Sequence, residues 1–205
     1  MMIPERDRVQ NQRDIIEPDL LVAAYASGYF PMADSHQGRI RWYSPDPRAI
    51  IPLDQFRISR SLQQTLGKNI YEVKINTAFE EVIRSCATRL ETWISEEIIE
   101  SYLELHCEGL AHSVETWRSG KLAGGLYGVA LGAAFFGESM FSSERDASKV
   151  ALAALVERLR RKQYVLLDTQ YLTPHLARFG TIEIPRAGYL QLLSTAVNKQ
   201  TSFLD

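Results

Sequence analysis

The sequence contains only two cysteines among its 205 residues, Cys86 and Cys107. The two have no metal-ligand spacing, and an isolated pair of thiols in a reducing compartment is seldom a disulfide. We therefore expect both to be small buried hydrophobic groups, and we expect no metal site.

Long apolar runs are also missing. No segment approaches the roughly 20 residues that cross a bilayer, and the first fourteen residues lack the apolar core of a secretory signal. We therefore expect a cytoplasmic protein without a membrane partner. The net charge of −2 argues against bulk attraction to nucleic acid but permits a local basic patch. With 45% hydrophobic residues, the chain can bury a full core in one main domain with a small N-terminal addition.

The stretch richest in glycine and aromatic residues runs from Gly124 to Leu152 and resembles two strands followed by a helix. Glycine inside a strand marks a bulge or a close approach of a ligand, which favours a concave floor here. Glu138 falls between Phe136 and Met140 on the two-residue period of a strand, so its carboxylate is carried into apolar surroundings. A charge in such a place needs a partner, and a ligand is one candidate. The glycines are Gly124, Gly125, Gly128, Gly132 and Gly137.

Capping signals and helical spacing predict several further elements. Ser143 and Asp146 form a capping box for the helix after the two strands, and Thr77 and Glu80 form another one earlier in the chain. Trp93 stands at the entrance of a helix that ends at about Gly109. A Trp at such a junction fits both core packing and a stacking platform.

The N-terminal part shows a short helix that begins after Asp19 and stops at Gly28, followed by a loop over residues 29–32. Two prolines within residues 41–48 predict a rigid loop, either a stiff connection or a ligand-facing segment. A short strand is expected over residues 50–53.

Residues 111–126 switch to a period of two around Ser119 and Gly120, which predicts a hairpin. His112 lies on its first strand. A lone His on a strand is usually a structural group with its hydrogen bonds satisfied, and we expect that role here.

Asp168 and Gln170 stand two residues apart at the end of an apolar run that reads as a buried strand. Their side chains can therefore point the same way. An acceptor beside an amide suits the orientation of a nucleophile. The alternative is a cap for the next helix, since Thr169 and the Thr173-Pro174 pair also resemble a helix start.

Ten short motifs follow one another along the chain: FPM, WYSPDPR, ISRS, TWI, HSVE, GGLYGVALG, FFGESMFS, ASKVAL, LLDTQ and FG. In this order they closely resemble the leucyl/phenylalanyl-tRNA–protein transferase family, over about residues 20–193. The resemblance implies an α+β fold with a mixed, mainly antiparallel sheet flanked by helices. A small N-terminal domain (residues 1–60) would precede a catalytic domain similar to GNAT acyltransferases (residues 61–205).

The activity implied by this resemblance is transfer of Leu, Phe or, less well, Met from aminoacyl-tRNA to proteins that begin with Arg or Lys. The product would carry an N-degron. An aminoacyl ester is already activated, so its aminolysis needs positioning, proton transfer and oxyanion stabilisation rather than a cofactor. We expect a monomer with no cofactor.

The resemblance also implies roles for individual residues. Asp168 and Gln170 would orient and deprotonate the attacking amine, and Glu138 would help hold the aminoacyl group. Trp93 would stack on the terminal adenine. An apolar pocket, which separates near-isosteres only weakly, would be lined by Leu126, Phe135, Gly137, Phe141 and Leu167.

The chain departs from the family pattern at two places. Met32 stands where many members have Trp in the loop that covers the terminal adenosine. Gln63 and Gln64 stand where members with a basic helix carry Lys and Arg. Contact with the tRNA acceptor stem would then depend on Arg57, Arg60 and Lys68.

Two other functions compete with this one. An acyl-CoA-dependent N-acyltransferase needs a glycine-rich pyrophosphate loop, which the sequence lacks. A non-catalytic module that recognises N-termini or tRNA ends would not require the pair of Asp168 and Gln170.

Overall fold

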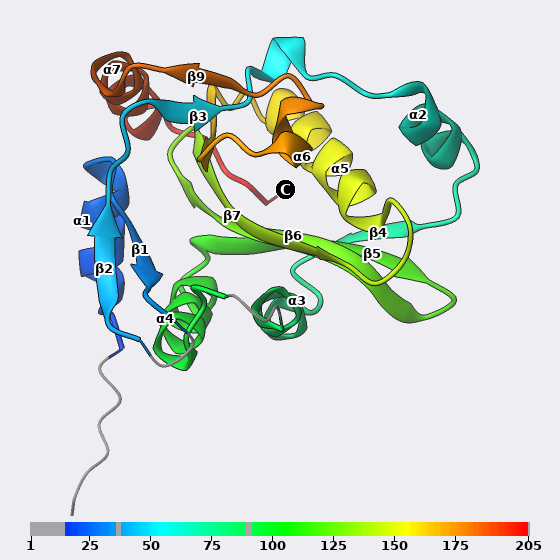
Figure 1. Ribbon diagram of the computed structural model, residues 1–205, viewed down its shortest axis with the longest axis horizontal. Helices are drawn as coiled ribbons and strands as arrows, with labels where there is room; N and C mark the ends of the chain where they lie inside the picture. Colours follow the sequence, from blue (N-terminus) through cyan, green and yellow to red (C-terminus); the bar gives the residue numbers. More distant parts are fainter. Residues whose placement is uncertain (1–14, 36–37, 89–91, 205) are drawn as a thin grey trace, which may run out of the picture.

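A seven-stranded sheet forms the centre of the computed structural model, which describes residues 15–35, 38–88 and 92–204 (Figure 1). The strand order is β4, β5, β6, β7, β8, β3, β9, and all neighbours are antiparallel except β7 and β8. The predicted α+β class with a mixed, mainly antiparallel sheet is confirmed. The strands are β3 (Arg48–Ile50), β4 (Glu72–Ile75), β5 (Ala111–Arg118), β6 (Lys121–Leu131), β7 (Ala134–Ser142), β8 (Leu166–Gln170) and β9 (Ile182–Ile184).

Helices cover both faces of the sheet (Figure 1). One face packs on α5 (Ala147–Arg161), around a core cluster that includes Leu126 and Phe135. The other face carries a second cluster, which includes Tyr25 and Tyr102. Its helices are α1 (Pro18–Ala26), α3 (Phe79–Ala87), α4 (Glu96–Cys107) and α7 (Arg186–Val197). The connections hold η1 (Leu53–Gln55), α2 (Arg60–Gly67) and α6 (Pro174–Ala177).

The small N-terminal region consists of α1 and two antiparallel strands, β1 (Phe30–Ala33) and β2 (Ile40–Tyr43). The loop predicted over residues 29–32 is therefore wrong for its last three residues, because pairing with β2 draws them into a strand. The short strand expected over residues 50–53 is wrong for its last three residues, because β3 runs from Arg48 to Ile50 and η1 starts at Leu53. Since β3 belongs to the main sheet, residues before the predicted domain boundary at 60 contribute to that sheet; the boundary itself stays a prediction.

The capping box predicted for α5 is wrong. The helix begins after Asp146, whose backbone is left-handed (φ 62°) and whose carboxylate pairs with Lys149 at 2.6 Å instead of capping. The Ser142 hydroxyl accepts a hydrogen bond from the Ser148 N–H at 3.2 Å. A side chain from the preceding strand thus takes the place expected for Ser143.

The capping box predicted for α3 is also wrong. The Thr77 and Ala78 N–H groups donate to the Glu115 carboxylate at 2.9 and 3.1 Å. Burial raises the pKa of Glu115, but hydrogen bonds from the Ser113 and Thr77 hydroxyls and from the Ala78 N–H outweigh it and lower that pKa. A tertiary contact from β5 therefore replaces the local cap that Glu80 would complete.

Other expectations are confirmed. The hairpin of β5 and β6 turns at Ser119 and Gly120, and α4 follows the predicted span from just after Trp93 to Gly109. His112 is buried, lies 2.9 Å from the Asn76 amide and stacks on a ring of the C-terminal segment, as expected of a structural group. Cys86 is buried as predicted, but Cys107 at the end of α4 is exposed.

Three glycines of the richest stretch serve different needs. A Cβ on Gly124 would lie 2.7 Å from the Ala147 Cβ, and one on Gly128 would overlap the Phe136 carbonyl oxygen. Gly124 thus lets α5 approach β6 closely, and Gly128 faces a bulge in β7. Gly137, in contrast, has only ordinary contact space around it.

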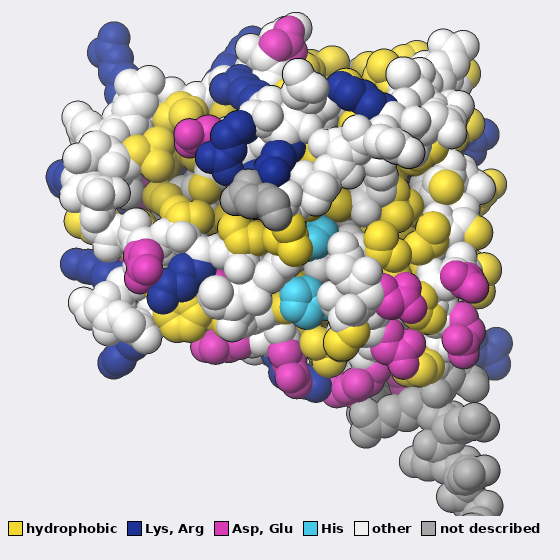
Figure 2. Space-filling view, turned by 180° about the vertical axis from the view of Figure 1, so that it is seen from behind, with side chains coloured by type: hydrophobic (Ala, Val, Ile, Leu, Met, Phe, Trp, Pro, Cys, Tyr) yellow, Lys and Arg dark blue, Asp and Glu magenta, His cyan; other side chains and the backbone are white. Residues whose placement is uncertain are grey.

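One edge of the surface is rich in acidic side chains (Figure 2). Acidic side chains gather along the edge occupied by α3 and α4 (Figure 2), where the first turns carry Glu80, Glu81, Glu96 and Glu97. Among the described residues, no helix has both the length and the apolar character needed to cross a bilayer.

Candidate active site

A cavity of about 860 Å³ opens where β7 and β8 separate. The two parallel strands are paired from Ala134 and Leu166 up to Phe136 and Asp168, and β7 then continues to Ser142 without β8 beside it. Lining residues come from the end of β7 and from the residues that end or follow β8. The cavity thus lies between two strands that are held together at one end only.

Glu138 lies on a bulge at the floor of this cavity. Its neighbours in β7 pair with β6, Gly137 with Gly128 and Ser139 with Tyr127, so Glu138 is the additional residue between them. Bulges re-aim side chains, and they are frequent beside active sites.

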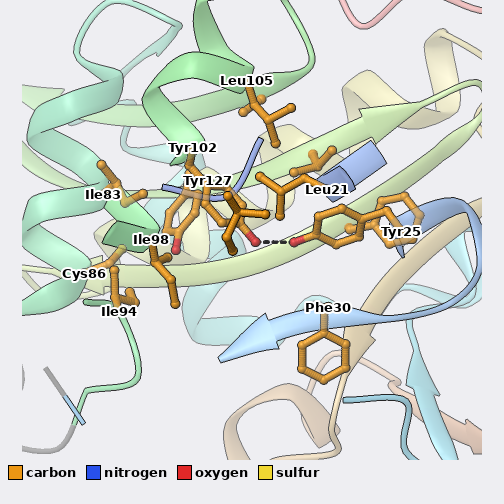
Figure 3. Packing of buried hydrophobic residues seen from close by; sticks show 14 of the residues in the cluster. Leu21, Tyr25, Phe30, Ile83, Cys86, Ile94, Ile98, Tyr102, Leu105 and Tyr127 are labelled. Atoms are coloured by element: carbon orange, nitrogen blue, oxygen red, sulfur yellow. Dashed lines mark hydrogen bonds between the residues drawn. The ribbon is translucent and has the colours of Figure 1, made fainter. Parts of the chain in front are cut away.

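Three donors surround the half-buried Glu138 carboxyl. One oxygen accepts from the Tyr25 hydroxyl at 2.7 Å and from the Gln170 amide at 3.3 Å, and the other accepts from the Tyr102 hydroxyl at 3.3 Å. The two hydroxyls also hydrogen-bond each other within the core cluster (Figure 3). Burial raises the pKa of Glu138 to about 8, assisted by the nearby charge of Asp168 and opposed by the Tyr25 hydrogen bond.

Asp168 lies behind the cavity lining and is fully buried. Its carboxylate accepts from two nitrogens of Arg48 at 2.9 and 2.6 Å, from the Tyr189 hydroxyl at 2.7 Å and from the Gln170 N–H at 2.9 Å. The alternative role as a helix cap is wrong, because Thr173 caps α6 by accepting from the Leu176 N–H. Asp168 therefore connects Arg48 to the backbone of Gln170.

Arg48 is also fully buried. Its guanidinium lies between the rings of Phe30 and Tyr189, 4.7 and 4.6 Å from their centroids, and donates to the Gly28 carbonyl at 3.1 Å. Burial disfavours the charged form, but the hydrogen bond and charge of Asp168 outweigh it and raise the pKa of Arg48. The N-terminal region thus closes over the ion pair.

Apolar residues and an aromatic rim complete the cavity. Leu126, Phe141 and Leu167 line the cavity, Met32 lines it from β1, and Trp93 lines it from the segment before α4. The Ala33 N–H donates to the Trp93 carbonyl at 3.0 Å, which ties β1 to this rim.

Phe135 does not fit its expected place. It is fully buried beside α5, stacks on Phe203 at 5.2 Å and lies outside the described lining of the cavity. Because strand residues alternate between faces, its ring packs into the core while Phe136 points to the opposite face.

Two family models cover this chain. The leucyl/phenylalanyl-tRNA protein transferase model matches residues 50–194, and the model of the N-terminal domain of these transferases matches residues 14–46. The chain belongs to the leucyl/phenylalanyl-tRNA–protein transferase family.

Curated members of this family are similar over almost their whole length. The transferase of Herpetosiphon aurantiacus is 57% identical over 189 residues, which cover 92% of this chain and 98% of the relative. That of Rubrobacter xylanophilus has the same identity and coverage. Among solved structures, that of L-PGS from Bacillus licheniformis has a TM-score of 0.42 and 15% identity, covering 80% of this chain and 56% of that one. Membership of the transferase family makes the chain a tRNA-dependent aminoacyltransferase.

The three residues predicted to carry out the transferase reaction lie close together. The Gln170 side-chain amide donates a hydrogen bond to Glu138, and its backbone N–H donates one to Asp168. The three predicted tRNA contacts lie apart from the cavity lining, exposed before and along α2: Arg57, Arg60 and Lys68.

The sequence did not point to Arg48, Tyr25, Tyr102 or Tyr189 as site residues. Arg48 closes the WYSPDPR motif, and an Arg next to a proline-rich loop gives no local sign of burial. The tyrosines read as ordinary members of apolar helix stripes. Only the acid at position 138, which needed a partner, hinted that such donors exist.

Proposed function

We propose that this transferase moves Leu, Phe or Met from aminoacyl-tRNA to the α-amine of proteins that begin with Arg or Lys, and so creates an N-degron. The observation that carries the proposal is the apolar cavity with Glu138 and Gln170 side by side at the point where β7 and β8 separate. An apolar side chain fits the cavity, and the polar pair lies where the ester would be attacked.

The roles follow the geometry of the cavity. The donor side chain packs against Leu126, Phe141 and Leu167, next to Gly137. Gln170 orients the amine, and Asp168 fixes the backbone of Gln170. Glu138 contacts the reacting groups.

The tRNA end extends away from this point. Trp93 and Met32 enclose the terminal adenine at the rim. The acceptor stem contacts Arg57, Arg60 and Lys68, with Gln63 and Gln64 between them contributing no charge. We propose that the protein works as a monomer in the cytoplasm, where charged tRNA is made.

Incubation with labelled Leu-tRNA or Phe-tRNA and a protein with N-terminal Arg tests the function. Label should pass to the protein, and it should not pass to the same protein with an acetylated N-terminus, because the α-amine is the nucleophile. Ribonuclease treatment of the donor should abolish transfer, and acetyl-CoA should not replace it. Binding of charged tRNA without transfer would instead favour a non-catalytic module, and turnover with acetyl-CoA would favour the acyl-CoA rival.

A further inference from the structure

The two carboxyl groups at the separation of β7 and β8 have different surroundings. An ionised carboxyl has about four acceptor sites, and those of Asp168 meet four donors: two from Arg48, one from Tyr189 and the Gln170 N–H. Asp168 is also wholly buried and behind the cavity lining. Glu138 lines the cavity and contacts neutral donors. Only the second carboxyl is presented to a substrate.

We infer that Glu138 accepts the proton of the attacking amine and that the hydroxyls of Tyr25 and Tyr102 position it for this step. The inference rests on the proposed function and deepens it. Asp168 is then a positioning residue, which acts through the backbone of Gln170.

The step balances without a further reactant. The nitrogen lone pair of the acceptor amine forms a bond to the ester carbonyl carbon, and the carbonyl π electrons move to its oxygen. The proton on nitrogen passes to the Glu138 carboxylate. The carbonyl then re-forms, and the bond from carbon to the ribose oxygen breaks. That oxygen leaves with the electron pair and receives the proton from Glu138. The products are the amide, the free ribose hydroxyl of tRNA and the ionised Glu138.

The proton affinities of donor and acceptor agree. Burial raises the pKa of Glu138 to about 8, and a free α-amine has a pKa of about 8, so proton exchange between them is nearly balanced. The hydroxyls of Tyr25 and Tyr102 stabilise the charged form, and burial raises the pKa of both tyrosines far enough that they remain donors. The ionisable groups facing Glu138 are Tyr25 on α1, Tyr102 on α4, Asp168 on β8, Arg48 on β3 and Tyr189 on α7.

Single-turnover transfer from Leu-tRNA to a protein with N-terminal Arg, measured from about pH 6 to about pH 9 around the amine pKa, tests the inference. Glu138→Gln should lower the rate by roughly 10²-fold or more, the scale of a positioned acid–base group. Tyr102→Phe should move the rising limb to higher pH and lower the rate at neutral pH by roughly two- to ten-fold, the effect of one lost hydrogen bond. As a control, Tyr164→Phe removes the hydroxyl of another buried tyrosine, packed on Phe203, and should leave the profile unchanged.

Thermal midpoints on the same preparations show whether each variant folds. A folded Glu138→Gln protein with the wild-type rate and profile would overturn the inference, and so would a Tyr102→Phe profile identical to the wild type. If Glu138→Gln does not fold, the Tyr102→Phe profile decides. A wild-type protein that transfers nothing from charged tRNA would instead overturn the proposed function, and this inference with it.

Discussion

At the scale of single residues, the buried pair of Arg48 and Asp168 determines how the site is held. Taking two charges out of water costs several kcal/mol each, and the cost is offset only when geometry and further hydrogen bonds are good. Here the guanidinium has two aromatic faces and a carbonyl, and the carboxylate has two further donors. Removing either partner would leave a buried charge without its counter-charge, so the intact pair fixes the end of β8.

Asp168→Asn tests this. It leaves the Arg48 charge buried without its counter-charge, so we expect a loss of about 3–5 kcal/mol in the free energy of unfolding. Turnover should also fall by roughly 10²-fold or more, because Gln170 is no longer held for the positioned proton transfer. Tyr189→Phe is the matched control: it removes one donor to the same carboxylate and should cost only about 1 kcal/mol. Denaturant unfolding and single-turnover transfer measure both quantities, and normal transfer in a normally stable Asp168→Asn protein would contradict the positioning role.

Sequence spacing brought Asp168 and Gln170 together correctly, since they share one strand end. It could not supply their partners. Arg48 lies 120 residues before Asp168, and Tyr25 lies 113 residues before Glu138, so no local period connects them. Burial of a charged or phenolic side chain is decided by which elements meet, and no local pattern records that.

At the scale of elements, α5 packs closely against β6 and forms part of the cavity wall. The helix contributes Ser148, Leu152 and Leu155 to the cavity wall, and its first turn lies against Gly124. A strand position without a side chain is therefore part of how the pocket is shaped.

Gly124→Ala should consequently destabilise the protein by about 1–3 kcal/mol, because overpacking pushes the helix from the sheet. Gly188→Ala is the control: the site is in α7, a Cβ there meets nothing within 4 Å, and reduced chain entropy should stabilise by about 0.4–1 kcal/mol. Chemical denaturation of both variants gives the comparison. An equal effect of the two substitutions would mean that a methyl group at position 124 fits between α5 and β6 without overpacking them.

The types and order of most elements were predictable, because hydrophobic period and turn residues are local. The starts of α3 and α5 were not, since Glu115 and Ser142 provide caps from neighbouring strands. The glycines were expected to mark a bulge or the close approach of a ligand; Gly128 faces a bulge, whereas Gly124 makes room for α5. A glycine pattern shows that space is short, and only the fold shows what occupies it.

At the scale of the whole molecule, the half-buried Glu138 and the buried His112 connect stability to pH with opposite signs. Glu138 has a pKa of about 8 when folded against an ordinary value of 4.5, so the folded state binds more protons between these values. Its contribution to stability is therefore lost as pH rises from 4.5 to 8. His112, whose pKa burial lowers from 6.5 to about 4, binds fewer protons when folded, and its contribution is lost as pH falls through that window.

Glu138→Gln separates these contributions. The variant lacks the titrating carboxyl, so its thermal midpoint should gain on that of the wild type as pH rises from 4.5 to 8. Below 6.5, both proteins should lose stability through His112 alike. Thermal melts at matched ionic strength across this range measure the difference. A constant difference at every pH would mean that Glu138 ionises in the folded protein as it does in water.

The contacts made by residues 15–35 reach beyond their own small region. Tyr25 donates to Glu138, while the Gly28 carbonyl and the Phe30 ring cover Arg48. The segment thus supplies direct contacts to Glu138 and Arg48, and if Glu138 accepts the proton of the amine, it supplies part of the chemistry. A chimaera that received this segment from another member of the family would also receive its hydrogen bond to the active-site carboxyl. The exchange of segments between these enzymes would therefore shift the pH at which that carboxyl ionises, and with it the pH range of activity.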